Sequence, residues 1–121
     1  MKQISINNVP KEALDNWPLF TGKVFRQSAI KETDGSEITI DYIHFPKGIR
    51  NKFHSHTNDQ ILIVTQGKGI VATEKETFNA KEGDIFYIPA GEKHWHGATD
   101  DSDFTHISII RQGAKFTQVE K

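Results

Sequence analysis

The sequence predicts a single all-β domain, built as an antiparallel sandwich or barrel, and three observations lead to this class. With 121 residues, 36% of them hydrophobic, the chain can form one core and has little material for a second. From Lys23 onward, short segments rich in β-branched and aromatic residues alternate with turn sequences such as TDGS, KEGD and PAGE. None of these segments shows a helical period, and many short strands at nearly even spacing are typical of sandwiches and barrels.

Residues 1–22 are expected to form an N-terminal arm, and residues 23–121 the barrel. Pro10 and Pro18 leave room for only a turn or two of helix in the arm. No internal repeat or linker divides the remainder. The strands expected in the barrel are 23–30, 37–45, 60–66, 69–75, 76–82, 84–89, 93–99 and 103–111, with the sequence QGKG as the turn between the third and the fourth.

Composition excludes several classes of function. The net charge is -1 and the chain has no basic block, so a nucleic-acid partner is not expected. No apolar run approaches the ~20 residues of a membrane span, and the opening MKQISINNVP lacks the apolar middle of a secretory signal. We therefore expect no membrane partner and a cytoplasmic location. The chain has no cysteine, so any metal would be held by nitrogen and oxygen ligands.

The stretch FHSHTNDQILIVTQGKG, residues 53–69, places two histidines one residue apart ahead of an apolar strand. Alternate residues of a strand share a face, so His54 and His56 project to the same side, about 6 to 7 Å apart along the backbone. If Gln60 opens the next strand on that face, its amide oxygen supplies a third ligand. Leu62 and Val64 would then line the interior by alternation.

A second cluster, GDIFYIPAGEKHWHGA, carries His94 and His96 on one face of a strand and Trp95 on the other. If the strands 93–99 and 103–111 pair as a hairpin, His96 faces His106 across the pair. In the same register His94 faces Ser108, and five of the six histidines look into one cavity.

Ordinary structural roles compete with these functional ones. His54 and His56 alone fit two exposed histidines near a loop almost as well as a metal site, and His94 at its own spacing favours the metal site. His96 and His106 fit either roles in the pocket or packing of the hairpin. His44 is expected to have no functional role.

The spacings resemble the two signature motifs of the cupin superfamily. The first family motif is G, five residues, HxH, three or four residues, E, six residues, G, and the residues here are Gly48, His54, His56, Gln60 and Gly67. Every gap agrees, and glutamine replaces the usual glutamate.

The second family motif is G, five residues, PxG, two residues, H, three residues, N. Gly83, Pro89, Gly91 and His94 match it, while Ala98 stands where asparagine is usual. The two motifs extend from residue 48 to residue 98, and the flanking segments are compatible with the family.

The resemblance implies a double-stranded β-helix, the cupin jelly-roll barrel. It also implies one divalent transition metal per chain (Mn, Fe, Ni, Co or Zn) with His54, His56, Gln60 and His94 as ligands. With glutamine in place of glutamate, the sequence resembles a subset of small cupins. This subset includes relatives of carboxymuconolactone decarboxylases and manganese-dependent hydroxynitrile lyases.

Two departures from those lyases count against cyanohydrin chemistry. The lyases offer a His and, four residues later, a Gln from the strand after the second motif, whereas this chain has His106 and Ile110. The chain also carries Asp41 at a pocket position where the resemblance implies a small apolar residue.

The implied ligand set has consequences for chemistry. Three neutral imidazoles and one amide oxygen leave a divalent ion its full charge, which disfavours oxidation and strengthens Lewis acidity towards a carbonyl or carboxylate. His96 and His106 are candidate general bases, because an unperturbed imidazole titrates near neutral pH.

Asp41 is a third candidate for proton transfer if the strand 37–45 sends Asp41, Ile43 and Phe45 inward. The opposite parity would bury Ile38, Ile40 and Tyr42 and leave Asp41 in solvent. Alternation alone does not decide between the two, and only the resemblance favours the first.

The sequence therefore predicts a metal-dependent enzyme of lyase, isomerase or decarboxylase type that acts on a small carbonyl or hydroxy-carboxylate substrate. The alternatives are a non-catalytic ligand-binding cupin and a metal-dependent dioxygenase. A homodimer is expected, because Trp17, Phe20 and Trp95 offer apolar surface that a small monomer would struggle to cover.

Overall fold

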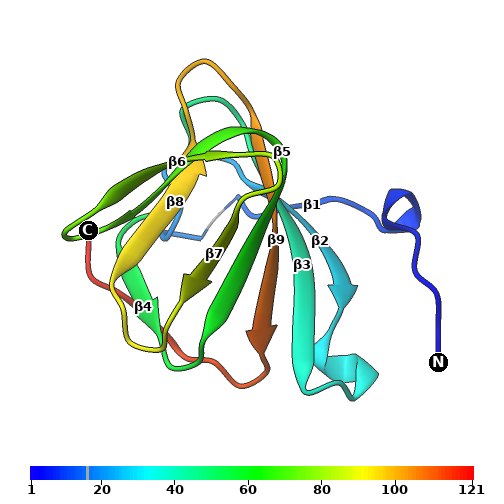
Figure 1. Cartoon of the computed structure of the whole chain (residues 1–121). Coiled ribbons are helices and arrows are strands. Elements are labelled where there is room, and N and C mark those ends of the chain that lie inside the picture. The colour runs from blue at the N-terminus through cyan, green and yellow to red at the C-terminus, as the bar shows by residue number, and fades with distance from the viewer. Residues whose placement is uncertain (16) are drawn as a thin grey trace.

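The structure is a computed structural model that describes residues 1–15 and 17–121. Antiparallel strands curl around one interior, and two short 3-10 helices, η1 (Ile6–Asn8) and η2 (Glu32–Asp34), lie outside it (Figure 1). The strands are β1 (Glu12–Ala13), β2 (Phe25–Ile30), β3 (Ile38–Phe45), β4 (His54–His56), β5 (Gln60–Thr73), β6 (Thr77–Lys81), β7 (Ile85–Ile88), β8 (His94–Ala98), β9 (Phe104–Arg111) and β10 (Phe116–Gln118). The expected all-β jelly-roll class is confirmed.

Two sheets share the long strand β5. Its first half pairs with β9 and β7, and the first sheet continues through β3 and β2 to β1. Its second half pairs with β6 and β8, and the second sheet continues through β4 to β10. Consequently, one continuous strand holds the two walls of the barrel together.

The turn expected at QGKG is wrong, because β5 passes through it without a break. Gly67 has a positive φ of 77°, a conformation that favours glycine, and a Cβ there would collide with the backbone of Asp103. A register shift between Val64 and Gln66 precedes this position. The chain therefore bends at Gly67 and changes sheets while its pairing continues.

The hairpin expected between the strands 93–99 and 103–111 is also wrong. In β8, His96 pairs with Val71, whereas in β9 His106 pairs with Val64 on one side and Ile43 on the other. Because the loop between β8 and β9 crosses from one sheet to the other, His96 and His106 face each other across the interior. His94 is paired with His54 and Thr73, and not with Ser108.

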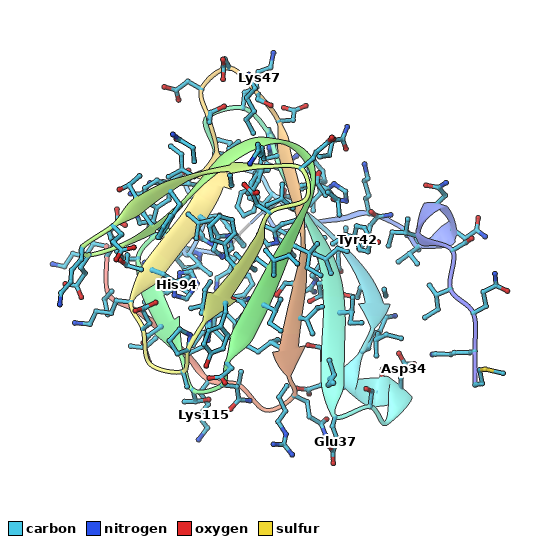
Figure 2. The ribbon with its side chains drawn as sticks, viewed as in Figure 1. Asp34, Glu37, Tyr42, Lys47, His94 and Lys115 are labelled. Carbon is cyan, nitrogen blue, oxygen red and sulfur yellow. The ribbon has the colours of Figure 1, made fainter. Side chains whose placement is uncertain are left out.

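The inward faces of the strands divide into an apolar and a polar part. Leu62 and Val64 are buried, as alternation predicts, and belong to the hydrophobic core. Figure 2 shows His94 inside the barrel, whereas Asp34 and Glu37 lie at its periphery. The core residues are Val24, Phe45, Leu62, Val64, Val71, Ala80, Ile88, Ala98 and Phe104.

Within residues 1–22, the predicted arm, the N-terminus and η1 stand away from the barrel (Figure 1), whereas later described residues contact it. Strand β1 of the arm pairs with β2, and Phe20 forms an isolated bridge with Asn51. The Phe20 ring packs against the core, and Trp17 meets it edge-on with ring centroids 5.2 Å apart. The arm thereby brings two aromatic side chains to one end of the interior.

Among residues 1–15 and 17–121, no helix has the length and apolar character that crossing a membrane would require.

Candidate metal centre

Three histidines from two neighbouring strands converge inside the barrel. His54 and His56 lie on β4, and His94 lies on β8 directly opposite His54. One ring nitrogen from each lies within 4.8 Å of the others, and all three side chains are buried. This separation allows the three nitrogens to bind a single ion.

Backbone carbonyls determine which nitrogen of each ring is available. Each Nδ1 lies close to a carbonyl oxygen two residues away in the chain, and a carbonyl can only accept a hydrogen bond. Each Nδ1 therefore carries the proton, and each Nε2 offers its lone pair, which is the tautomer that a metal ligand needs. The three distances are His54 to Lys52 2.6 Å, His56 to Asn58 2.8 Å, and His94 to Glu92 2.8 Å.

Gln60, the first residue of β5, brings an oxygen to the same place. Its Oε1 lies 2.9 Å from Nε2 of His56, while its amide Nε2 donates to Oγ of Ser108 at 2.8 Å. A carbonyl oxygen and an unprotonated nitrogen repel each other at this distance unless a cation or a proton lies between them. Nε2 of His94 is also buried, and no described residue provides a hydrogen-bond partner for it.

These observations fit a divalent transition ion. Three imidazole nitrogens and one amide oxygen form a donor set of intermediate softness, which suits Mn, Fe, Co, Ni or Zn. Burial lowers the pKa of His54 to about 4, and burial together with the neighbouring imidazoles lowers the pKa of His94 to about 3. Both rings are therefore neutral at pH 7 and need lose no proton to act as ligands.

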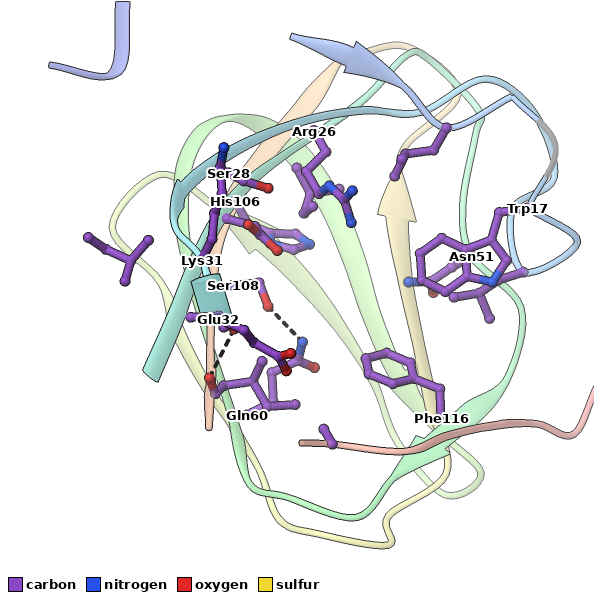
Figure 3. A pocket seen from close by; sticks show the side chains of 18 of the residues that line it. Trp17, Arg26, Ser28, Lys31, Glu32, Asn51, Gln60, His106, Ser108 and Phe116 are labelled. Carbon is purple, nitrogen blue, oxygen red and sulfur yellow. Dashed lines mark hydrogen bonds between the residues drawn. The ribbon is translucent and has the colours of Figure 1, made fainter. Parts of the chain in front are cut away.

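A cavity of about 680 Å³ opens beside the histidine cluster. One wall is aromatic and is formed by Trp17, Phe20, Phe45 and Phe116. The other wall is polar, and Figure 3 shows several of its side chains around His106. The polar residues that line it include Arg26, Ser28, Asp41, Gln60, His106 and Ser108.

Phe116 is a residue of the site that the sequence interpretation missed. Strand β10 pairs with β4, and Phe116 stacks on His54 with ring centroids 6.0 Å apart and an angle of 8° between the planes. Its ring is also 5.3 Å from that of His56. The only sequence signal was an isolated phenylalanine in a polar C-terminal segment, since a strand of three residues shows no useful alternation.

Asp41 faces the cavity, together with Ile43 and Phe45 of the same strand. The alternative, with Asp41 in solvent, is not observed. In the first sheet Asp41 lies between Ser28 on β2 and Ser108 on β9. Burial raises the pKa of Asp41, and a hydrogen bond with Ser28 and the positive charge of Arg26 partly oppose this. Asp41 is thus a partly desolvated carboxyl group close to the residue that orients Gln60.

His96 and His106 lie deeper in the same cavity and interact with each other. Nε2 of His106 is 2.9 Å from Nδ1 of His96, and the amide nitrogen of Asn51 is 3.2 Å from Nε2 of His96. Burial lowers the pKa of His106 to about 3 and holds the pKa of His96 well below its ordinary value. Both rings are therefore neutral at pH 7.

His44 and Trp95 lie outside the cavity. His44 bonds Thr105 and Gln27 at 2.9 and 2.7 Å, in keeping with the structural role expected for it. Trp95 is covered by the guanidinium of Arg50, 4.6 Å from its ring centroid.

Fold and site together define a small β-barrel protein with a buried three-histidine cluster that could hold a metal. Residues 41–110 match the Cupin domain family, which is more than half of the chain, so the chain belongs to the cupin family. The expected resemblance is confirmed.

Three known proteins place the chain within this family. It is 32% identical over 109 residues to an (R)-mandelonitrile lyase of Granulicella tundricola, covering 88% of this chain and 83% of that protein. It is 26% identical over 115 residues to an acireductone dioxygenase of Acidiphilium cryptum, of which it covers 63%. The structure of a cupin-like protein from Thermotoga maritima superimposes with a TM-score of 0.75 at 34% identity, over 82% of this chain and 79% of that one.

The low pKa values predict that acid destabilises the metal-free protein. The pKa values of His54 and His94 are about 4 and 3 when folded and 6.5 when unfolded, so below about pH 6.5 the unfolded chain binds more protons. Each ring should then reduce the free energy of unfolding by about 1.4 kcal/mol per pH unit, down to its folded pKa. Urea denaturation of the metal-free protein between about pH 7 and pH 4 measures this slope. The His94→Asn variant should show a smaller slope, and a flat profile for the wild type would contradict the prediction.

Proposed function

We propose that this cupin is a metal-dependent enzyme that acts on a small carbonyl or hydroxy-carboxylate compound, in a reaction of lyase, isomerase or decarboxylase type. The single observation that carries this proposal is the orientation of the donor atoms. Three Nε2 lone pairs and the Oε1 of Gln60 face one another beside a cavity. We propose one ion per chain, bound by His54, His56, Gln60 and His94, with manganese among the candidates.

The uncharged ligands favour polarisation over redox chemistry. When bound, the ion would supply Lewis acidity to a carbonyl or carboxylate oxygen of the substrate. Because none of the four ligands is anionic, the net charge at the centre stays high and oxidation of the ion is disfavoured. In a structural metal site, protein ligands fill all the coordination positions of the ion. Four protein ligands on a five- or six-coordinate ion would instead leave at least one position for substrate.

Residues of the cavity other than the metal ligands have the remaining roles in the proposed reaction. Trp17 and Phe116 cover the apolar side of the cavity and limit access of water to the centre. Asp41 is the proposed proton acceptor, since it faces the cavity and its raised pKa brings it closer to the range of a general base. The ring nitrogens of His96, by contrast, both have partners within the protein.

The relatives support the lyase type without assigning a substrate. The Granulicella protein is named as an (R)-mandelonitrile lyase and matches most of this chain. Asp41 and Ile110 are the two residues that differ from those expected in hydroxynitrile lyases, and both line the cavity. The chemistry of this cavity should therefore differ from that of those lyases. We therefore retain carbonyl or hydroxy-carboxylate compounds as the proposed substrate class.

A dioxygenase is the second candidate, and the similarity to acireductone dioxygenase favours it. A non-catalytic cupin that only binds a small ligand would use the same cavity. Dependence of the reaction on oxygen would distinguish the dioxygenase from the proposed function. Any turnover of substrate would distinguish the proposed function from a non-catalytic binding protein.

Removal of the metal tests the proposal directly. Elemental analysis should find one divalent metal per chain, and dialysis against a chelator should abolish turnover of a panel of 2-hydroxy acids and ketones. One of Mn, Fe, Ni, Co or Zn should restore it, equally well with and without oxygen. Turnover that survives complete removal of the metal would contradict the proposal, and strict dependence on oxygen would favour the dioxygenase.

Replacement of Asp41 tests the proposed proton acceptor. Asp41→Asn keeps the shape of the side chain but removes its basicity, so turnover should fall by roughly 10²- to 10⁴-fold while the bound metal is retained. Asp100→Asn, the same change at an exposed loop position, is the control and should leave turnover unchanged. Full activity in Asp41→Asn would assign the proton transfer to another group.

The apolar surface available for a dimer differs from the surface expected. Phe20 packs at the cavity and Trp95 lies under Arg50, so of the three residues expected to offer apolar surface only Trp17, which is 41% exposed, offers much of it. Instead, cross-strand neighbours on the outer face of β3, β9, β5 and β7 form two apolar rows. The rows are Ile40, Ile109, Ile61 and Tyr87, and Tyr42, Ile107, Ile63 and Ile85.

We propose that a second copy of the chain covers this outer face, because Ile85 and Tyr87 are 67% and 64% exposed at its edge. Equilibrium sedimentation should find a dimer. The double variant Ile85→Lys and Tyr87→Lys should be monomeric, because two charges would be buried in the interface. Val119→Lys, at an exposed apolar residue elsewhere, is the control. A monomeric wild-type protein would overturn this proposal.

A further inference from the structure

We propose that His106 donates a hydrogen bond to an acceptor atom of the substrate, and that Asn51 and His96 fix it in this role. The inference rests on the proposed function, since it assigns a task to a residue of the same cavity. It follows from a chain of three side chains in which each donor direction determines the next.

The chain of hydrogen bonds begins at Asn51, whose amide has only one possible orientation. The backbone N–H of His96 donates to Oδ1 of Asn51 at 2.8 Å. The other amide atom, Nδ2, therefore faces the His96 ring, where it lies 3.2 Å from Nε2 and 3.4 Å from Nδ1. An amide nitrogen can only donate, so the nearer ring atom, Nε2 of His96, accepts.

The tautomers of both imidazoles follow from this orientation. With Nε2 of His96 accepting, the proton of the neutral ring is on Nδ1, which donates to Nε2 of His106 at 2.9 Å. Nε2 of His106 is then the acceptor, and its Nδ1 carries the proton. The reverse order would place an N–H of His96 against the N–H of Asn51.

Nδ1 of His106 is the last donor in the hydrogen-bonded relay that runs from Asn51 through His96 to His106. The atom is buried and has no hydrogen bond of good geometry with a described residue, although backbone groups of His106 and Ile107 lie near the ring. The ring lines the cavity near Ser28 and Ser108, as Figure 3 shows. Buried N–H groups nearly always have a partner, so we infer that the partner arrives with the ligand.

The chemistry of the missing partner is that of an oxygen acceptor: a carboxylate, a carbonyl, or an alkoxide that develops during reaction. A fixed N–H aimed at developing negative charge stabilises it without reorganisation. In this arrangement His106 touches the substrate as a donor, whereas Asn51 and His96 act through it as positioning residues. The removal of a proton is left to another group, and Asp41 lies diagonally across from His106 on the neighbouring strand.

The tautomer can be observed directly. Zinc-loaded protein with ¹⁵N-labelled histidine should show, in long-range ¹H–¹⁵N spectra, a His106 ring protonated at Nδ1 and unprotonated at Nε2. Asn51→Leu removes the donor that orients the relay and should give a mixture of the two tautomers. A wild-type His106 ring protonated at Nε2 would overturn the inference, whatever the enzyme turns over.

Ligand binding provides the second test, with glycolate as a small hydroxy-carboxylate probe. His106→Phe keeps a ring of similar size but removes the donor, and it should weaken glycolate binding to the zinc-loaded protein by about tenfold or more. His44→Phe, the same change on the opposite face of the sheet, should not. Equal affinity in wild type and His106→Phe would overturn the inference. Failure of the wild type to bind glycolate would count against the proposed substrate class, and the tautomer would still decide the role of His106.

Discussion

Hydrogen bonds from imidazole Nδ1 atoms to backbone carbonyls are the interactions on which the site depends. Each of His54, His56 and His94 is held by a carbonyl only two residues away, so the strand that carries a ring also orients it. The barrel then has only to bring β4 and β8 together for three lone pairs to converge. Burial supports the same state, because desolvation keeps the rings neutral.

The cavity beside this cluster is assembled from distant parts of the chain. The N-terminal arm brings Trp17 and the C-terminal strand brings Phe116, and their ring centroids lie 6.3 Å apart. The polar wall comes from the first sheet, where Asp41 and Ser108 are direct neighbours. An aromatic side of the cavity therefore lies opposite a polar side, which is an arrangement typical of small-molecule sites.

Local residue patterns correctly indicate which side chains of a strand lie inside the barrel, but they do not indicate how the chain passes from one sheet to the other. Alternation correctly placed Leu62 and Val64 inside, because the side-chain period of a strand does not depend on its partners. The prediction of a hairpin between β8 and β9 was wrong, because these consecutive strands lie in different sheets and pair with strands that are distant in the sequence. The continuity of β5 was missed for a related reason: its glycine bends the strand from one sheet to the other, whereas in the sequence it signals a turn.

The sequence by itself predicted the class of fold, which the structure confirms, and pointed to His54, His56 and His94, the three histidines that could hold a metal. Both follow from residue spacings within short segments. Tertiary structure alone decided which donors face one another, that Asp41 points into the cavity, and that His96 and His106 meet across the interior at 2.9 Å. It also decided the directions of the hydrogen bonds in the relay from Asn51. These outcomes depend on contacts between residues far apart in the chain, and the long-range pairing of strands that creates them leaves no local pattern in the sequence.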